Sequence, residues 1–422
     1  MKKNIKIALV NNMNNNFFSF QRYLLDKGLC VDLIQIDDLD DHFMPKADSF
    51  FEDEFNNFID LRGKLELRNI IYNPFFPLFN KKALNMIHET LCHYDLIIAC
   101  GNIFFLTAAG IQVDIYVPYG NDFYRILDPP KFKYKVPFLD YFRLKGQKKY
   151  LELQKKAIKQ SRVIVLDAEI FLILKKALNV LNRKSLNLKF PILFMDKKYK
   201  NKIERFNPIW DSLSNKDFIL FSHTRQNWKN KKKLGQAYKG NDIAIKGFAK
   251  FLKNQKRYHK PCLVLFEYGL DIEYSKKLIK ELNIQDFVVW KKKMHRKHIY
   301  QGIIKSNLII DSFNTEMISF GGCPWEAFIC QKPIIGNAIV KGKSKESEYS
   351  IIHARNVKDV YQILLDYSKN EEKYKEIGKK SFDWFQNNVG FKNIDRYMDL
   401  FEVLLSNPKK KYEDLVNILN KK

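Results

Sequence analysis

The sequence predicts an α/β protein built from two Rossmann-like domains that face a cleft. Short apolar runs alternate with longer amphipathic runs along the chain, and this alternation starts again near the middle. Strands that alternate with helices are typical of parallel sheets with right-handed crossovers. The length of 422 residues also favours two hydrophobic cores over one.

The first domain is expected to comprise residues 1–205. Its first strand, helix and second strand are predicted at "IKIALV" (5–10), at "FFSFQRYLLDKG" (17–28), which ends at Gly28, and at "CVDLIQI" (30–36). Three further apolar runs are each followed by a helical or loop segment, and these are "YDLIIAC" (94–100), "VDIYVPYG" (113–120) and "RVIVLD" (162–167).

The second domain is expected to comprise residues 206–395, because periodicity is lost within 190–215 and then resumes. A strand at "KDFILFS" (216–222) precedes a helix at "NDIAIKGFAKFLKNQ" (241–255). Four more strands are predicted at "PCLVLFEYG" (261–269), "FVVWK" (287–291), "NLIIDSF" (307–313) and "KPIIGN" (332–337). Residues 396–422 are predicted to form a helical tail, whose helices are candidates to cross back to the first domain.

Composition restricts the functional classes. A formal charge of +26 predicts an anionic partner, which leaves nucleic acid, an acidic membrane surface and a phosphorylated substrate open. The six cysteines form no C-x-x-C pair, so we expect buried reduced thiols without a disulfide frame or a zinc site. The apolar run at the N-terminus is too short for an export signal, and no run reaches membrane-spanning length. We therefore expect a cytoplasmic protein.

The stretch "DSFNTEMISFGGCPWEAFICQKPII" (311–335) is the first candidate site. Its loop lies beyond the carboxyl end of a predicted strand, where open parallel sheets bind ligands. Gly321 and Gly322 would let the backbone N–H groups at a helix N-terminus approach an anion. Glu326, about one turn into that helix, can accept hydrogen bonds from vicinal hydroxyl groups such as those of a ribose. A turn with a surface glutamate is the competing explanation.

A second stretch, "FSHTRQNWKNKKKLGQAYKGND" (221–242), follows the first strand of the same domain. Arg225 and Lys239 flank the predicted cleft and could clamp a diphosphate near a helix that Asp242 could cap. Lys229 and residues 231–233 are expected to lie in a solvated loop.

In the first domain, "NNMNNNFF" (11–18) follows the first strand, and its asparagines, Asn12 and Asn15 among them, are suited to hydroxyl-rich ligands. "VPYGNDFYRI" (117–126) again places a glycine and an acid just after a strand. A plain loop is the competing explanation for the asparagines, because the whole chain is rich in this residue.

These stretches resemble a glycosyltransferase with the GT-B fold, most similar to glycosyltransferase family 4 of the bacterial surface-glycan type. The resemblance covers most of the second domain, and "GGCPWEAFICQKPII" is its most specific part, similar to the family's glycine-rich loop and following "EA" motif. In the first domain, "PYGNDF" (118–123) resembles the family's "HG-x-D" turn near the reacting sugar. Tyr119, Gly120, Asn121 and Asp122 occupy that turn.

The resemblance implies a role for each matching residue. Glu326 would bind the nucleotide ribose, and Gly321 and Gly322 the diphosphate. Arg225 and Lys239 would neutralise the leaving phosphate, with Asp122 as a further catalytic residue. Asn12, Asn15, Tyr119, Gly120 and Asn121 would lie near the acceptor or the transferred sugar.

Two departures from the family pattern matter. A first glutamate is expected eight residues before Glu326, where Ile318 stands, which leaves Glu316 as a weak donor-binding candidate. Tyr119 replaces the histidine of many members. If the family's retaining chemistry applies, no protein nucleophile is needed, because the leaving diphosphate accepts the acceptor's proton on the same face.

The favoured function is therefore transfer of a sugar from a nucleotide-sugar donor to an envelope glycan or lipid-linked acceptor. No cofactor or metal is expected, because no carboxylate pair offers a Mg²⁺ site. A basic nucleic-acid-binding protein and a non-catalytic nucleotide-sugar binder are the alternatives. Nucleic acid is not the expected partner, because the basic residues are spread over both domains and no nucleic-acid-binding module is recognisable. The positive charge also predicts peripheral binding to the anionic inner face of a membrane.

Overall fold

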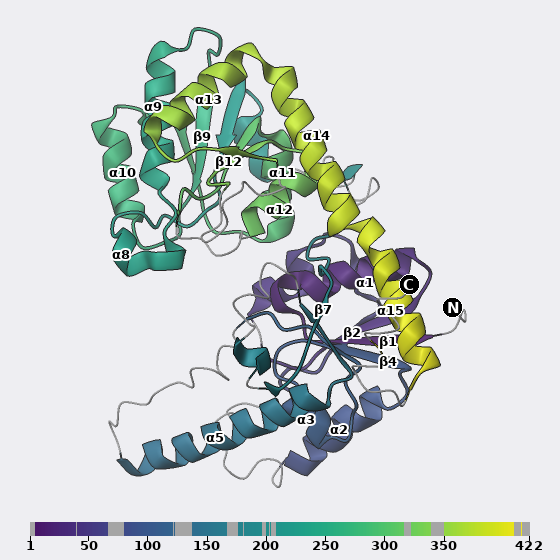
Figure 1. Ribbon diagram of the computed structural model, residues 1–422. Coiled ribbons are helices and arrows are strands. Elements are labelled where there is room, and N and C mark those ends of the chain that lie inside the picture. The colour runs from purple at the N-terminus through teal and green to yellow at the C-terminus, as the bar shows by residue number, and fades with distance from the viewer. Residues whose placement is uncertain are drawn as a thin grey trace. The chain divides into compact units, whose positions relative to one another are not determined.

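The computed structural model describes residues 5–38, 40–65, 80–120, 122, 137–166, 176–179, 181–195, 200–201, 203, 208–315, 322–338, 350–408 and 415. The chain forms two compact units. Unit 1 contains Met1–Phe194 and Asn388–Lys422, and unit 2 contains Met195–Asn387. Each unit is built around one parallel sheet (Figure 1).

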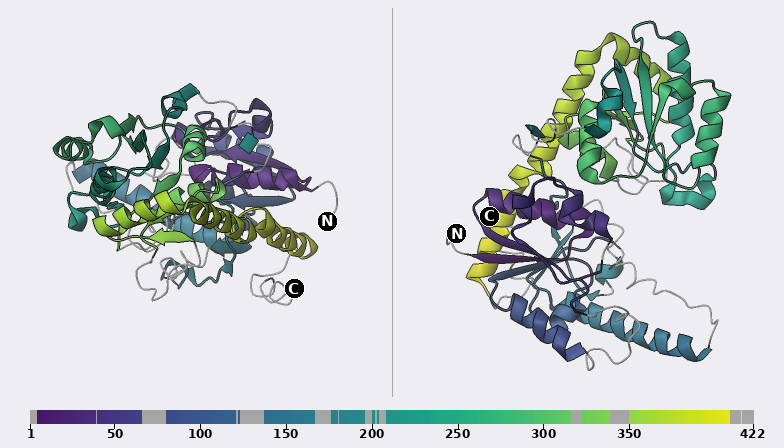
Figure 2. Two further views of the ribbon diagram at one scale, coloured as in Figure 1. Left: turned by 90° about the horizontal axis from the view of Figure 1, so that it is seen from above. Right: turned by 180° about the vertical axis from the view of Figure 1, so that it is seen from behind.

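Unit 1 has a seven-stranded sheet in the order β3-β2-β1-β4-β5-β6-β7. The strands are β1 (Lys6–Val10), β2 (Cys30–Gln35), β3 (Phe58–Asp60), β4 (Leu96–Ala99), β5 (Ile115–Tyr116), β6 (Val163–Leu166) and β7 (Leu186–Asn187). Helix α1 (Asn16–Asp26) covers one face, and α2 (Lys81–Leu91), α3 (Phe104–Ala108) and α5 (Pro137–Gln160) cover the other (Figures 1 and 2). Burial on both faces explains why the central strands are continuous apolar runs.

Unit 2 has a six-stranded sheet in the order β10-β9-β8-β11-β12-β13. The strands are β8 (Phe218–Phe221), β9 (Pro261–Phe266), β10 (Val288–Lys291), β11 (Leu308–Ile310), β12 (Ile334–Gly336) and β13 (Ile351–His353). One face packs against α9 (Asn241–Asn254), α10 (Ile272–Glu281) and α13 (Val357–Lys369), and the other against α11 (Arg296–Lys305) and α12 (Gly322–Ile329) (Figure 1). A short helix, α8 (Lys231–Leu234), precedes α9.

The predicted alternation of strands and helices is confirmed in both units. Each strand expected from an apolar run is present, and α1 ends just before Gly28, which adopts a φ of +78°. Strands β3, β7 and β13 were not predicted, because each has only two or three residues and its sequence does not form a longer apolar run. Residues 231–233, expected to be loop, begin α8, although their side chains are exposed as expected.

The C-terminal helices cross back to unit 1, as expected. Helix α14 (Glu371–Asn388) ends where unit 2 ends, and α15 (Ile394–Ser406) belongs to unit 1. Asp395 pairs with Lys27 at 2.6 Å, and the Tyr397 hydroxyl donates to the backbone oxygen of Lys189 at 3.1 Å. The Tyr397 ring also packs on Phe20 at 4.9 Å between centroids.

The unit boundary lies between Phe194 and Met195, earlier than the division after residue 205 that the sequence suggested. Ile203 explains the difference. It is buried, and its backbone oxygen accepts a hydrogen bond from Gln301 Nε2 at 3.3 Å, so this segment packs with unit 2. The last unit 2 residue is Asn387, whereas the sequence analysis continued the second domain to residue 395.

The cysteines differ in part from the expectation of buried reduced thiols. All six are free, and Cys100, Cys262 and Cys330 are buried, but Cys30 and Cys92 are exposed. Cys30 opens β2 at the edge of the apolar run, and Cys92 follows the last residue of α2, so both lie at ends of elements where water reaches the side chain. None of the helices in the described ranges combines the length and apolar character that a membrane span requires.

Candidate functional site

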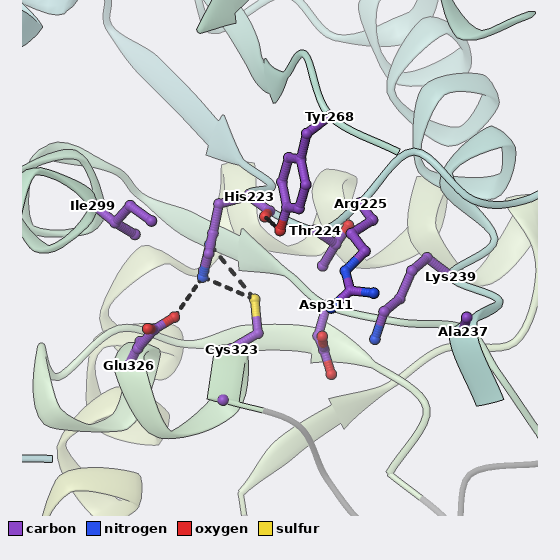
Figure 3. Close-up of a pocket in the computed structure, with 11 residues that line it drawn as sticks. His223, Thr224, Arg225, Ala237, Lys239, Tyr268, Ile299, Asp311, Cys323 and Glu326 are labelled. Carbon is purple, nitrogen blue, oxygen red and sulfur yellow. Dashed lines mark hydrogen bonds and ion pairs between the residues drawn. The ribbon is translucent and has the colours of Figure 1, made fainter. Parts of the chain in front are cut away.

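A pocket of about 390 Å³ opens at the carboxyl ends of the strands of unit 2 (Figure 3). The segments after β8, β9 and β11 and the first turn of α12 line it, and this edge of a parallel sheet is where such folds bind ligands. The lining residues are His223, Thr224, Arg225, Ala237, Lys239, Tyr268, Ile299, Asp311, Gly322, Cys323 and Glu326. The structure therefore brings together Arg225, Lys239, Gly322 and Glu326, which the sequence analysis had selected from two separate stretches.

Glu326 lies one turn into α12, as expected, and is 7% exposed. His223 Nε2 contacts its Oε2 at 2.6 Å, and Arg296 Nε donates to its Oε1 at 3.2 Å. Burial acts to raise the pKa of Glu326, but His223 and Arg296 outweigh it and hold the pKa below its ordinary value. The carboxylate is therefore fixed and charged, and each oxygen keeps a second lone pair with which it can accept a ligand hydroxyl.

Hydrogen bonds and close packing fix the loop that carries His223 and Arg225 at the wall of the pocket. Asn241 Nδ2 donates to Thr224 Oγ1 at 3.1 Å, and the Tyr268 hydroxyl donates to the His223 backbone oxygen at 2.8 Å. Gly269, with a φ of +120°, approaches Gln226 so closely that a Cβ would lie 2.5 Å from the Gln226 nitrogen. Only glycine fits there, because both the backbone conformation and the contact exclude a side chain.

Arg225 and Lys239 bring two positive charges to the same end of the pocket (Figure 3). The backbone of Lys239 is fixed on both sides, since its N–H donates to the Asn227 oxygen at 2.7 Å and its oxygen accepts from Phe313 at 2.9 Å. Neither Arg225 nor Lys239 forms an ion pair with any acid in the described ranges. Their charge is therefore available to an anionic ligand.

The expected cap at Asp242 is wrong. Helix α9 begins at Asn241, its N-cap residue is Gly240 with a φ of +70°, and the Asp242 carboxylate pairs with Lys246 at 3.0 Å. Glycine is favoured at the cap because residues with a side chain rarely adopt this φ and because a Cβ would lie only 3.2 Å from the Phe313 Cβ.

Gly322 is the first residue of α12 and borders the pocket. A Cβ added to it would meet no atom within 4 Å, so packing does not require glycine at this position. A glycine that neither the backbone nor packing demands is consistent with close approach of a ligand to the helix N-terminus. Gly321 and Glu316, the other two donor-binding candidates, lie outside the described residues.

One group of side chains in the described part of the chain has the spacing of metal ligands. Potential ligand atoms of His223, Cys323 and Glu326 lie within 4.8 Å of one another. Arg296 already contacts this carboxylate, and Arg225 and Lys239 line the same pocket. Three positive charges oppose a cation and favour an anion. The absence of a metal requirement stays a prediction.

In unit 1, Asn12 and Asn15 are buried and serve the protein itself. Asn12 Nδ2 donates to the Phe43 backbone oxygen at 2.7 Å, and Asn15 Nδ2 donates to the His42 oxygen at 3.2 Å. The Asn12 Oδ1 accepts from the Phe18 N–H at 3.1 Å, near the start of α1. Their amides therefore fix the 3-10 helix Asp41–Phe43, and the expected position of both residues near a sugar stays a prediction.

Asp122 lies six residues after the end of β5 and is 3% exposed. Its Oδ2 accepts from the Tyr116 hydroxyl at 2.6 Å, and its Oδ1 accepts from the Gly120 N–H at 2.9 Å. The carboxylate thus shapes the turn that contains Tyr119 and Gly120, and its expected catalytic role stays a prediction. Asn121 lies outside the described residues.

The sequence analysis missed Asp37, which lies close to this turn. Its carboxylate accepts from Asn102 Nδ2 at 3.2 Å, and a Cβ on Gly101 would lie 3.0 Å from Asp37 Oδ2 and 3.1 Å from the Tyr119 ring. Its position just after the second predicted strand was the available signal. His223 and Arg296 were also missed. His223 directly follows "KDFILFS" (216–222), and Arg296 lies in the basic stretch "WKKKMHRKH" (290–298), from which no site residue was predicted.

Comparison with solved structures shows that the chain has the GT-B fold, which confirms the architecture expected from the sequence. No family model and no curated protein sequence matches the chain. The Anabaena protein HepE, solved with UDP and glucose, is 13% identical with a TM-score of 0.55, and the match covers 95% of this chain and 100% of HepE.

Two further structures are similar over nearly the whole chain. A glycosyltransferase from Rickettsia africae is 14% identical with a TM-score of 0.55, covering 96% of this chain and 99% of its own. A UDP-N-acetylglucosamine 2-epimerase is 12% identical with a TM-score of 0.54, covering 97% and 98%. At these identities the likeness establishes the fold, and the activity has to be argued from the site.

Proposed function

We propose that the protein is a glycosyltransferase that takes a sugar from a nucleotide-sugar donor bound in the pocket of unit 2. The observation that carries this proposal is that one pocket at the strand ends holds a fixed, charged Glu326 together with Arg225 and Lys239, two cations that form no ion pair with a described acid. A ribose offers hydroxyl groups to the first, and a diphosphate offers negative charge to the second. Similarity to the UDP-bound HepE structure supports the same ligand class.

The proposed donor pose follows from the positions of Glu326 at one end of the pocket and of Arg225 and Lys239 at the other. The ribose hydroxyls donate to Glu326, which His223 and Arg296 hold in place. The diphosphate lies by Gly322 at the N-terminus of α12, where free backbone N–H groups and the helix dipole favour an anion, and Arg225 and Lys239 neutralise it.

The proposed reaction needs no protein nucleophile. The bond between the sugar's anomeric carbon and the donor's phosphate oxygen breaks, and its electron pair stays on the diphosphate. A bond from the anomeric carbon to the acceptor oxygen forms on the same face, and the acceptor's proton passes to the diphosphate. Arg225 and Lys239 act on the charge that develops during this step, so they stabilise the transition state more than the bound donor.

Three finer features belong to the same proposal. The enzyme is of the family 4 type and retaining, and it requires no divalent metal, because cationic side chains occupy the phosphate end. Its acceptor is an envelope glycan or a lipid-linked glycan at the inner face of a membrane. The support for membrane attachment is the net charge of +26 together with four exposed lysines along one face of α5, namely Lys145, Lys148, Lys156 and Lys159.

Titration calorimetry tests the proposal. Nucleoside diphosphates and short DNA duplexes are titrated separately into the protein, with Glu326→Gln as the comparison variant. We expect one nucleoside diphosphate to bind in EDTA and Glu326→Gln to weaken it. A screen of common nucleotide sugars with mixed acceptors should then show release of that diphosphate. Duplex binding without nucleotide binding would overturn the proposal in favour of a nucleic-acid partner, and nucleotide-sugar binding without turnover would indicate a non-catalytic binder.

A further inference from the structure

Asp311 is a charged residue of the pocket that the proposed donor pose does not use. It follows directly after β11, lines the pocket and is 5% exposed. Its backbone N–H donates to the Ile335 oxygen at 2.9 Å, which fixes its position at the end of the sheet. Its Oδ1 is buried and receives no hydrogen bond from any residue that the structure describes. A buried acceptor without a partner costs free energy, and a ligand group that donates a hydrogen bond to this oxygen would remove that cost.

The neighbours of Asp311 do not satisfy that oxygen. Arg225 and Lys239 point toward the same space in Figure 3, yet no ion pair joins either to Asp311. Cys323 is a further neighbour, and the pKa of its thiol is raised by burial, by the charges of Asp311 and Glu326 and by a hydrogen bond with the Asp311 carboxylate, a bond that does not occupy Oδ1. The carboxylate therefore faces the pocket with an open acceptor position.

The proposed pose restricts which part of a donor can occupy that position. Glu326 and His223 lie at one end of the pocket, whereas Asp311 lies with the two cations at the other (Figure 3). In the proposed pose the ribose hydroxyls bind Glu326 and are not available to Asp311. The phosphates of a nucleotide sugar cannot donate a hydrogen bond to Asp311, because they carry no proton at neutral pH and have the same sign of charge as the carboxylate. The remaining hydrogen-bond donors of a nucleotide sugar at the phosphate end are the hydroxyl groups of the sugar itself.

We propose that Asp311 is a specificity-determining residue that accepts a hydrogen bond from a hydroxyl group of the transferred sugar. This inference rests on the proposed function, since it assumes a nucleotide-sugar donor in this pocket. It predicts that Asp311 contributes to the affinity for the nucleotide sugar but not to the affinity for the nucleoside diphosphate alone.

The test compares two ligands on three proteins by titration calorimetry. The ligands are the nucleoside diphosphate that the wild type binds and the corresponding nucleotide sugar. The proteins are the wild type, Asp311→Asn and the control Asp242→Asn, whose carboxylate forms only a surface pair with Lys246. Asp311→Asn should bind the nucleotide sugar roughly 10-fold to 100-fold more weakly and the diphosphate with equal or higher affinity. Asp242→Asn should match the wild type with both ligands.

A second measurement identifies the hydroxyl and does not depend on the variant folding. Nucleotide sugars that lack one hydroxyl each are titrated into the wild type, and one of them should lose the same roughly 10-fold or greater affinity. If no deoxy analogue is weaker than the parent sugar, or if Asp311→Asn weakens both ligands equally, the inference is overturned while the proposed function stands. If the wild type binds no nucleoside diphosphate, the proposed function fails, and this inference fails with it.

Discussion

Replacing Glu326 with glutamine removes one charge from the centre of the unit 2 site while preserving the side chain's shape. The carboxylate makes two hydrogen bonds with basic partners, to His223 at 2.6 Å and to Arg296 at 3.2 Å. A hydrogen bond to a charged group is worth about 1.5–3 kcal/mol, and the amide can replace one of the two acceptor oxygens. We therefore expect unit 2 to lose about 1.5–3 kcal/mol of its free energy of unfolding. Glu326→Ala, which leaves Arg296 without this partner, should cost about 3–5 kcal/mol.

The assay can report on unit 2 alone. The five tryptophans are Trp210, Trp228, Trp290, Trp325 and Trp384, and all of them lie in unit 2. Urea unfolding followed by tryptophan fluorescence therefore measures this unit, which matters because a two-unit chain need not unfold in one step. Glu281→Gln is the matched control, since Glu281 is exposed and pairs only loosely with Lys277 at 3.9 Å. It should change stability by less than about 0.5 kcal/mol.

The effect of pH has a defined sign. Because the pKa of Glu326 is below its ordinary value of 4.5, the carboxylate stabilises the fold fully above that value. The stabilisation is lost as the pH falls through the lower, folded-state pKa. The difference in stability between wild type and Glu326→Gln should hence shrink as the pH falls below 4.5.

A double-mutant cycle decides whether the contacts carry this energy. Glu326→Gln, Arg296→Met and the combined variant should give a coupling of about 0.5–3 kcal/mol. The reasoning is refuted if Glu326→Gln unfolds with the wild-type midpoint at neutral pH, or if the two substitutions are additive. In either case Glu326 would be held by the surrounding packing and not by its basic partners.

Three further predictions concern the phosphate end, the loop behind it and the surface of unit 1. Arg225→Ala and Lys239→Ala should each lower the turnover of donor by at least about 10-fold while shifting the urea midpoint little, and wild-type turnover in both would place the clamp elsewhere. Gly269→Ala should destabilise unit 2 by more than about 2 kcal/mol, because the added Cβ would overlap Gln226. The control Gly322→Ala should unfold like the wild type, because a Cβ there meets no atom within 4 Å. Equal stability of the two variants would contradict the packing argument. Vesicles with anionic lipid should co-sediment the protein at low salt and release it at high salt. Reversing the charge of the four α5 lysines should weaken this binding by roughly 1 kcal/mol per lysine. If the protein stays in the supernatant at low salt, the surface role is excluded.

The sequence by itself determined the architecture and the approximate location of the site. Parallel strands that are buried on both faces are continuous apolar runs, so the central strands of both sheets could be located from the hydrophobic pattern, whereas the short β3, β7 and β13 could not. Ligand-binding loops follow the carboxyl ends of such strands, which is why Arg225, Lys239, Gly322 and Glu326 could be selected before their proximity was known. Local chemistry was less reliable, since Asp242 looked like a helix cap but Gly240 takes that position.

Only the tertiary structure decided what each polar side chain does. Glu326 and His223 are 103 residues apart, and Arg296 is 30 residues from Glu326, so no local pattern reveals that the three meet. Asn12 and Asp122 matched their expected positions after strands, yet their hydrogen bonds are made to the protein's own backbone and side chains. The sequence shows which groups can form hydrogen bonds, but their partners depend on distances that exist only after the sheets are assembled.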